Sequence, residues 1–459
     1  MNKGKNILVD GSSQSDSDPP YSTDSDSDRM IFSDEESNDD DEEEDHLMGC
    51  IVPAMMMHQM EIEKKLIINS LNEPGVHGGS VPGRYHKQRD RVAGFHRMEK
   101  DYFAEHPVHR GRDFRIRCRM SKRLFLRIYD AILHSGNPYF EWKVDGLGVR
   151  GLHPKMKMMC GLRILAYGIA CDAQDDYLRI GQSTANKCLR EFCGVIITLF
   201  AKQYLRSPTD ADIANILEEN GNRGFPGCLG SLDCMHWEWK NCPTSHKGQY
   251  TGHHKVASLV LEAVATHDLW IWHAFFGMAG SNNDVNVLHA SPLFNQVLAG
   301  KSRPCEFQVN GTQYHQGYYL ADGIYLSWPT LISSIKIPQT KGEKNFCMRQ
   351  ESVRKDIERV FGVLQQRWHI IRNPATFWDV NVLDMIMKTC IILHNMVVED
   401  ERGDHIRDYL EDLPNGPAPP NVNERLNRQA FLQRLKSGML ALRDRSQHDK
   451  LKTDLIYHL

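Results

Sequence analysis

Hydrophobic side chains recur with two different periods along the chain, and the change falls near residue 222. Upstream of it, apolar positions return at three- and four-residue steps, which is the spacing of amphipathic helices. This period predicts helices over residues 121–133, 153–170 and 182–205, with Ser183 as the N-cap of the last one. Downstream, short apolar runs bounded by glycine and proline predict strands that alternate with further helices. The two periods predict a helical region followed by an α/β domain.

The end of the helical region has the order of a helix-turn-helix motif. A short helix-like segment over 172–181 and a turn containing Gly181 precede the helix over 182–205. Lys187 and Arg190 are expected on the outer face of that helix, where they would be able to contact DNA. A three-helix bundle that binds no DNA gives the same pattern, so the sequence leaves both alternatives open at this point.

The α/β region has a definite order of elements. Strands are predicted over 224–239 and twice within 255–280, where a tight turn falls at His267 and Asp268; a helix over 286–300, a strand over 317–325 and long helices over 354–370 and 381–400 follow. Strands followed by alternating strands and helices predict a mixed sheet with helices on its faces.

The predicted helix over 354–370 carries an acid on the edge of its apolar stripe. The stripe consists of Ile357, Val360, Phe361, Leu364 and Trp368. Glu358 borders the stripe, and Gly362 follows one turn later on the same side. A glycine inside a helix costs roughly 0.5–1 kcal/mol relative to alanine, so we expect Gly362 to leave space that something else needs. We predict that the stripe anchors the helix on the sheet and that Glu358 points toward a site.

Charge is distributed unevenly along the chain. Residues 1–46 hold 16 acids and three basic residues, a net charge of −13, so the remainder carries +9 of the total of −4. Residues 84–127 alone hold fourteen Lys and Arg against five acids. A body of this charge favours a polyanion such as DNA as a partner, although a solvated surface explains it as well.

Composition and periodicity together predict five segments. They are a disordered acidic tail (1–48), a basic N-terminal region with a Met-rich helix (49–120), a helical, helix-turn-helix-like region (121–206), an α/β domain (222–405), and a linker with a basic C-terminal helix (406–459). The tail is expected to be disordered because it is highly charged and almost free of apolar residues.

Cysteine usage and hydropathy exclude several classes of protein. The twelve cysteines include no CxxC pair, which argues against a zinc ribbon or a secreted disulfide framework and favours a reducing compartment. Cys234, His236, Cys242 and His246 lie close together in sequence but match no common zinc spacing. No apolar run reaches the roughly 18–20 residues of a membrane span, and no signal segment begins the chain. We therefore expect a soluble intracellular protein with no membrane partner.

Four acids stand where a sheet could bring them together. Asp233 lies within a predicted strand, and Asp284 follows the third strand. Asp322 lies at the end of YYLAD, where the next strand meets Gly323 and runs into a turn, and Glu358 lies on the helix edge. Carboxylates that converge repel one another, and a divalent cation keeps them ionised. Ligands that are all oxygen favour Mg²⁺ or Mn²⁺ over zinc. Two such ions are suited to in-line displacement at phosphorus.

Each of these acids also has a purely structural explanation. Asp322 before Gly323 could shape a turn, and Asp284 could cap a helix. Glu358 could pair with Arg354 one turn earlier on the helix. Spacing alone therefore leaves both the metal site and the structural alternatives open.

Four ordered motifs resemble the transposase of the PIF/Harbinger superfamily of DNA transposons, in particular its plant Pong/Ping-like branch. The motifs are GSLDCMHWEWKNCP, FFGMAGSNNDVNVL, YYLADGIY and RKDIERVFGVLQQRW, and CIILHNMVVED resembles the Leu-His-Asn helix of the same family. The resemblance covers roughly residues 120–410. It implies that residues 222–405 form a ribonuclease-H-like nuclease domain with a DDE triad of acids.

The resemblance also implies a role for each of the four acids. Asp233 matches the first Asp of the triad, Asp322 the second and Glu358 the final Glu, so these three are the expected catalytic residues. The 35 residues between Asp322 and Glu358 suit the spacing of this class. Asp284 matches a further acid, which makes Asp233, Asp284, Asp322 and Glu358 the expected ligands of two Mg²⁺ or Mn²⁺ ions. None of the four positions departs from the family pattern.

The function implied by the resemblance is that of a DNA transposase and endonuclease. Such an enzyme cuts double-stranded DNA at terminal inverted repeats and joins the freed 3′-OH to target DNA. The resemblance further implies a helix-turn-helix-like segment over 121–206 and a Myb/SANT-like partner protein. We also expect a homo-oligomeric active complex and a nuclear location, with shuttling to the cytoplasm compatible with it. The alternative is a domesticated, non-catalytic nuclear protein that binds DNA or chromatin, and the four intact acids favour the transposase over it.

Overall fold

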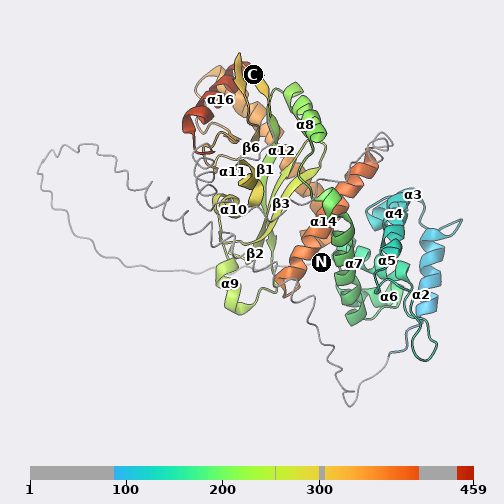
Figure 1. The fold of residues 1–459 in the computed structure, drawn as a ribbon. Helices are drawn as coiled ribbons and strands as arrows, with labels where there is room; N and C mark the ends of the chain where they lie inside the picture. Colours follow the sequence, from blue (N-terminus) through green and yellow to red (C-terminus); the bar gives the residue numbers. More distant parts are fainter. Residues whose placement is uncertain (1–86, 254, 299–304, 403–441) are drawn as a thin grey trace, which may run out of the picture. The chain divides into compact units, whose positions relative to one another are not determined.

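The computed structural model describes residues 87–253, 255–298, 305–402 and 442–459, all within one unit, Gly78–Leu459 (Figure 1). The predicted acidic tail, the Met-rich helix and the predicted linker lie outside the described residues. The predicted segment boundaries therefore stay predictions.

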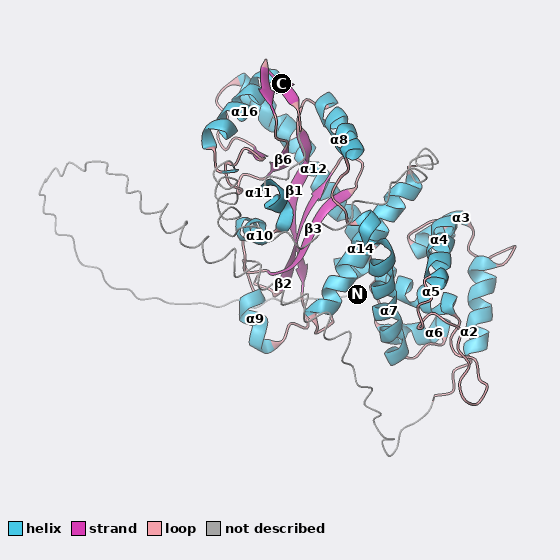
Figure 2. Ribbon diagram, in the orientation of Figure 1, coloured by secondary structure: helices cyan, strands magenta, loops and turns pink. Residues whose placement is uncertain are grey.

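A five-stranded mixed sheet forms the centre of the α/β part (Figure 2). Its order is β3-β2-β1-β6-β7, with β1 (Cys228–Glu238), β2 (Ser258–Ala265), β3 (Ile271–Ala279), β6 (Tyr318–Ala321) and β7 (Leu331–Ser333). The first three strands are mutually antiparallel, whereas β6 runs parallel to β1 and β7 runs parallel to β6. A separate hairpin is formed by β4 (Phe307–Val309) and β5 (Thr312–Tyr314). The mixed α/β class is confirmed, and this arrangement is consistent with a ribonuclease-H-like core.

Strand β2 shows why the centre of the sheet is so apolar. All eight of its side chains are buried, because helices cover both faces of the sheet at this strand. The turn from β2 to β3 falls where the sequence predicted it and spans residues 266–270. The carboxylate of Asp268 closes it by accepting hydrogen bonds from the Thr266 hydroxyl and the Trp270 amide.

The helices of the α/β part pack around this sheet. They are α8 (Asp210–Asn222), α9 (Thr244–Tyr250), α10 (Asp284–Ala290), α11 (Asn295–Leu298), α12 (Lys341–Arg367), α13 (His369–Arg372), α14 (Val380–Glu401) and α16 (Arg445–His458). The prediction of one helix over 286–300 was wrong, because α10 ends before the Ser291-Pro292 pair and a residue before proline disfavours the helical conformation. Helix α12 begins well before the predicted residue 354, at a capping box formed by Thr340 and Glu343.

The helical region contains helices at the predicted positions. Its helices are α2 (Arg91–Met98), α3 (Gly111–Cys118), α4 (Lys122–His134), α5 (Pro154–Tyr167), α6 (Gln174–Leu178) and α7 (Gln182–Tyr204). Two of them, α2 and α3, were not predicted. The predicted N-cap Ser183 was wrong, because Gly181 occupies that position and provides no side-chain cap. Helix α7 packs on α5 and also along α14 (Figure 1), so one buried core runs from the helical region to the sheet.

Helix α14 is a core helix with an unusual acidic end. By length and composition it would be able to cross a membrane, but 72% of its most apolar window is buried inside the fold. Its last turn carries Glu399, Asp400 and Glu401. The helix dipole disfavours negative charge at this end of a helix. Arg127, Arg123 and Arg115 of the helical region pair with these three acids in that order. Part of the basic stretch 84–127 is thus paired with the acidic end of α14, although these three arginine side chains remain about half exposed.

The Leu-His-Asn motif of α14 fastens this helix to the β2–β3 turn. The Asn395 side chain accepts a hydrogen bond from the Ile271 amide and donates to the carbonyls of Ile271 and Tyr204. The His394 ring lies fully buried with Nε2 2.8 Å from the Leu269 carbonyl. The motif is therefore structural within the described residues, and it lies outside the group of four acids.

Candidate active site

Asp233 lies in the middle of β1, where its neighbours position it closely. Leu232 before it is buried in the core, whereas the Asp233 side chain is 18% exposed. Ser231, two residues earlier and on the same face, donates a hydrogen bond to the Val353 carbonyl of α12. The Asp233 carboxylate therefore points toward α12, and its Oδ1 accepts a hydrogen bond from the Cys234 amide.

Asp322 follows the last residue of β6 and comes next to Asp233 through the strand register. Ser231 is paired with Leu320 in the parallel ladder, so the residues two positions further on, Asp233 and Asp322, lie at the same level. The Asp322 side chain is exposed, and its Oδ1 accepts a hydrogen bond from the Gly323 amide at 2.7 Å. The turn that was the structural alternative for Asp322 is thus present, and it uses only Oδ1 of this carboxylate.

Helix α12 presents Glu358 to the same end of the sheet. All five residues of its predicted stripe are buried in one core, although Trp368 lies just past the end of the helix. The buried Gln350 amide donates to the carbonyls of Ala321 and Ile332, which fixes the helix against the ends of β6 and β7. Glu358 is half-exposed on the edge of this helix, as predicted.

Arg354 joins two of the four acids. Its Nη1 lies 3.3 Å from Asp233 Oδ2, and its Nη2 lies 3.0 Å from Glu358 Oε1. The pairing of Arg354 with Glu358 was the structural alternative drawn from the sequence, and it is present. Because the same guanidinium also reaches Asp233, this ion pair brings Glu358 and Asp233 together around one positive charge.

Asp284 is the first residue of α10, directly after its N-cap Asn283. Burial raises the pKa of Asp284, and the carboxylates of Asp322 and Glu262 raise it further. Burial likewise raises the pKa of Asp233 to about 6, with Asp284 and Asp322 adding to the shift and Arg354 opposing it. The fold therefore places Asp233, Asp284 and Asp322 within electrostatic reach of one another, in a region of negative potential.

A cation would relieve this repulsion, and the donor set suits a hard one. Among the residues that the structure describes, no three His, Cys, Asp or Glu side chains converge closely enough to hold a metal ion in their present rotamers. Asp322 and Glu358 are exposed, so their rotamers are free to change on a fast time scale. The Arg354 guanidinium already lies between two of the carboxylates, which shows that a positive charge is accommodated there. An all-oxygen set of this kind fits Mg²⁺ or Mn²⁺.

Sequence reasoning missed a buried acid behind the site. Glu262 of β2 is fully buried, and its Oε1 lies 3.1 Å from His273 Nε2, while no partner of its Oε2 is described. The same His273 nitrogen lies 3.1 Å from Ser291 Oγ. An acid within the otherwise apolar run SLVLEAVA was the signal that could have identified it. Glu262 adds to the negative potential at Asp284.

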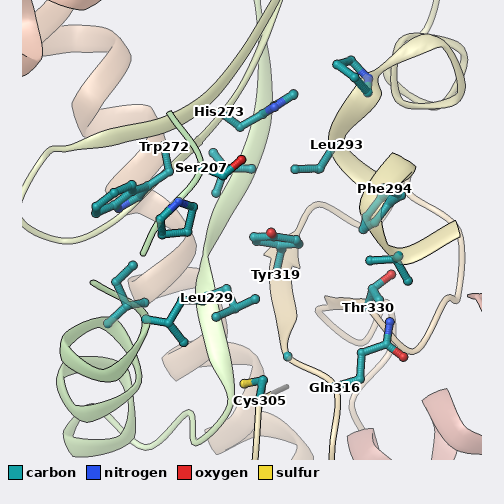
Figure 3. A pocket seen from close by; sticks show the side chains of 17 residues that line it. Ser207, Leu229, Trp272, His273, Leu293, Phe294, Cys305, Gln316, Tyr319 and Thr330 are labelled. Carbon is teal, nitrogen blue, oxygen red and sulfur yellow. The ribbon is translucent and has the colours of Figure 1, made fainter. Parts of the chain in front are cut away.

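An apolar cavity of about 170 Å³ lies on another part of the α/β region (Figure 3). Trp272, His273, Phe294 and Tyr319 are among its lining side chains, and none of its lining residues is acidic. It therefore has none of the chemistry expected for a phosphodiester substrate, and the group of four acids remains the candidate active site.

Comparison with known proteins bears on the residues that carry this site. Residues 202–405 match a family model described as plant transposon protein, and this range contains all four acids. Residues 202–405 thus carry a stretch similar to plant transposon proteins. The resemblance to Harbinger-type transposases is therefore confirmed. Residues 94–133 match a model described as a domain of unknown function (DUF8418).

Several known proteins are similar to this chain over part of their length. The chain is 23% identical over 277 residues to the "Putative nuclease HARBI1" of Bos taurus, covering 59% of this chain and 74% of that protein. It is 25% identical over 281 residues to the Xenopus laevis protein of the same name, covering 58% and 76%. It is 28% identical over 187 residues to Arabidopsis thaliana "Protein ALP1-like", covering 39% and 45%. No solved structure matches this chain. The names of the first two relatives support a nuclease as the general kind of protein.

Proposed function

We propose that this protein is a metal-dependent DNA transposase and endonuclease of the Harbinger type. The observation that carries the proposal is the position of the Arg354 guanidinium between Asp233 and Glu358, with Asp322 at the level of Asp233 on the neighbouring strand. The plant transposon domain and relatives named as nucleases support it. In this proposal the sheet and α12 form a ribonuclease-H-like core, and residues 121–206 contain the helix-turn-helix-like segment.

Asp233, Asp322 and Glu358, assisted by Asp284, would hold two Mg²⁺ or Mn²⁺ ions. When bound, such ions activate the attacking oxygen and stabilise the charge on the leaving oxygen of a phosphodiester. The rigid elements of the chain supply the positioning. Strand β1 fixes Asp233, the β6 end fixes Asp322, and the contacts of Ser231 and Gln350 fix the helix that carries Glu358.

The proposed reaction has two steps at phosphorus. In the first, the oxygen of water bonds to phosphorus at the element's end, the bond between phosphorus and the 3′ oxygen breaks, and that oxygen leaves as a 3′-OH. In the second, this 3′-OH bonds to a phosphorus of target DNA and displaces the target's own 3′ oxygen. Both steps exchange one phosphorus–oxygen bond for another and need no redox partner.

The proposal includes partners and a location that follow from the family resemblance. The substrates are double-stranded terminal inverted repeats and target DNA, the active complex is a homo-oligomer, and a Myb/SANT-like protein assists it. The protein acts in the nucleus.

Divalent metal provides the direct test. DNA that carries the repeats flanking the gene should be nicked to a new 3′-OH in Mg²⁺ or Mn²⁺ and left intact in EDTA. Metal should also raise the Tm of the wild-type protein, because binding to the folded state alone stabilises it. Asp233→Asn should reduce this rise in Tm. A protein that binds this DNA but gives no 3′-OH with either metal would be the non-catalytic DNA-binding protein of the alternative.

Gly362 offers a second test on the same helix. A Cβ at this position would meet no atom within 4 Å, so packing does not require glycine there. Gly362→Ala should raise the free energy of unfolding by about 0.5–1 kcal/mol, because alanine favours the helix. Gly362→Leu should reduce DNA cleavage more than stability, since its bulk lies one turn from Glu358 on the exposed face. Urea denaturation and cleavage rates measure the two effects, and a Leu variant that cleaves normally would show that DNA does not approach this face.

A further inference from the structure

A cavity of about 530 Å³ in the helical region is lined by an excess of positive charge. Its five cationic side chains are Arg89, Arg91, Lys157, Arg179 and Lys187. They come from the start of α2, the first turns of α5, the α6–α7 connection and the first turns of α7. None of the lining residues is acidic. We refer to this feature as the basic cavity.

Two of the five cations are held in place by the fold. Arg89 makes a two-point pair with Asp175, with Nε 2.9 Å from Oδ1 and Nη2 3.0 Å from Oδ2. The Lys157 amine donates to the Tyr139 carbonyl at 2.7 Å, and burial, with nearby Lys143, lowers its pKa. Arg91, Arg179 and Lys187 are exposed at the cavity. Only one of these five charges is balanced by a described carboxylate, so an anion at the cavity would be stabilised.

The start of α7 adds to the same potential. Gly181, its N-cap, has no side chain to cap the first amides of this 23-residue helix. The Arg89 guanidinium lies against this residue, because a Cβ on Gly181 would be 3.1 Å from Arg89 Cζ. Asp175 offsets the charge of Arg89, whereas Arg179 and Lys187 add positive charge near this helix N-terminus, which itself favours anions. Exposed Ser183 and Thr184 line the cavity at this point and provide hydroxyl donors.

The lining favours the backbone of DNA over its bases. Tyr139 is the one aromatic residue among those that line the cavity, and the amines of Lys157 and Lys187 lie 5.0 and 5.5 Å from its ring centre. Its ring is thus occupied and offers little surface for stacking on a base. The positive surface continues along α7 to exposed Arg190 beyond the cavity. An open, cationic surface without a base pocket suits a phosphodiester backbone that is bound without regard to sequence.

We propose that the basic cavity binds a backbone phosphate of double-stranded DNA. The phosphate oxygens would be held by Arg179, Lys187 and the first turn of α7, with Arg89 fixed behind them by Asp175. The proposal rests on the proposed function only in taking DNA as the polyanion. It concerns a site in the helical region, formed by none of the four acids.

The salt dependence of binding tests the basic cavity. The experiment titrates three full-length proteins with a duplex of arbitrary sequence at about 50 to 200 mM KCl. They are the wild type, the cavity variant Arg179→Gln/Lys187→Gln and the control variant Lys100→Gln/Lys202→Gln. The control removes the same charge from exposed positions that do not line the cavity. The slope of log Kd against log salt should fall by about 0.9 in the cavity variant, because the site binds one phosphate and each neutralised phosphate contributes about 0.9. The slope should stay unchanged in the control. The proposal would be overturned if the cavity variant and the wild type gave the same slope of log Kd against log salt. It would also be overturned if the slope fell as much in the control variant as in the cavity variant.

A charge reversal separates binding from folding. Thr184→Glu places an acid in the first turn of α7, which the helix dipole stabilises, so its Tm should not fall. The same acid should weaken duplex binding, because it repels a phosphate at the cavity. Duplex DNA binding that is unchanged in this variant would contradict a DNA phosphate site. A variant that binds single-stranded RNA more weakly but binds duplex DNA as well as wild type does would also contradict it. The salt dependence of duplex binding reports on the basic cavity, whereas the metal-dependent nicking that Asp322→Asn removes reports on the proposed function, so the two proposals fail separately.

Discussion

Replacing Asp322 by asparagine is expected to reduce metal-dependent DNA cleavage by a factor of about 10² to 10⁴ and to leave DNA binding unchanged. The loss follows because charge stabilisation by bound metal is worth several kcal/mol, and each 1.36 kcal/mol is a factor of ten in rate. An amide has no negative charge with which to hold the ion. The variant should still fold, because the side chain is exposed and an amide oxygen is able to accept the hydrogen bond from the Gly323 amide.

The measurement compares nicking rates and DNA affinity of the same preparations. Asp176→Asn is the matched control, since Asp176 is an exposed acid of the helical region outside the site. Glu358→Gln should lose as much activity as Asp322→Asn, and the double variant should lose little more, because groups that act as one unit are not additive. A variant at Asp322 that nicks DNA at the wild-type rate would remove the catalytic assignment.

Lowering the pH is expected to reduce the stability of the wild-type protein through His394. Burial, with the nearby Arg367, lowers the pKa of this ring to about 3, against an ordinary value of 6.5. Below pH 6.5 the unfolded chain therefore binds a proton that the folded protein excludes, and stability falls until the pH reaches about 3. At pH 5 this coupling amounts to about 2 kcal/mol of the free energy of unfolding, relative to pH above 7.5.

The test is the difference between wild type and His394→Gln. Other groups titrate in the same range, and the raised pKa of Asp233 acts with the opposite sign, since its proton is bound more tightly in the folded state. These contributions are common to both proteins and cancel in the difference. Urea denaturation at pH 7.5 and pH 5 should show the stability gap between the two proteins shrinking by about 2 kcal/mol. A gap that does not change with pH would mean that the buried ring is protonated or that it is not buried in solution.

Local pattern was sufficient for most of the secondary structure. The strands β1, β2 and β3 and the helices α4, α5, α7 and α14 were predicted from periodicity and turn residues alone. Short elements such as β7 and the β4–β5 hairpin were missed, because three residues carry too little periodicity to detect. Helix α8 was not predicted, because it lies between the two predicted regions. The break after α10 shows that a single proline, Pro292, outweighs an otherwise helical pattern.

The candidate site was predicted residue by residue, but its organisation was not. Asp233, Asp284, Asp322 and Glu358 were identified by position and by family resemblance, whereas Glu262 was not identified. The role of Gln350 in fixing α12 to two strand ends had no local signal. Such hydrogen bonds join residues that are far apart in sequence, and no period along the chain encodes them.

The sequence by itself determined which segments become helices and strands, which acids are available for chemistry, and which family the chain resembles. Only the tertiary structure decided what each charge does. Arg354 pairs with both Asp233 and Glu358. Arg115, Arg123 and Arg127 pair with the acids at the end of α14. Most cations of the basic cavity have no described carboxylate partner. The physical reason is that periodicity depends on neighbours within a few residues, whereas the energy of a charge depends on the partners and burial that folding brings to it.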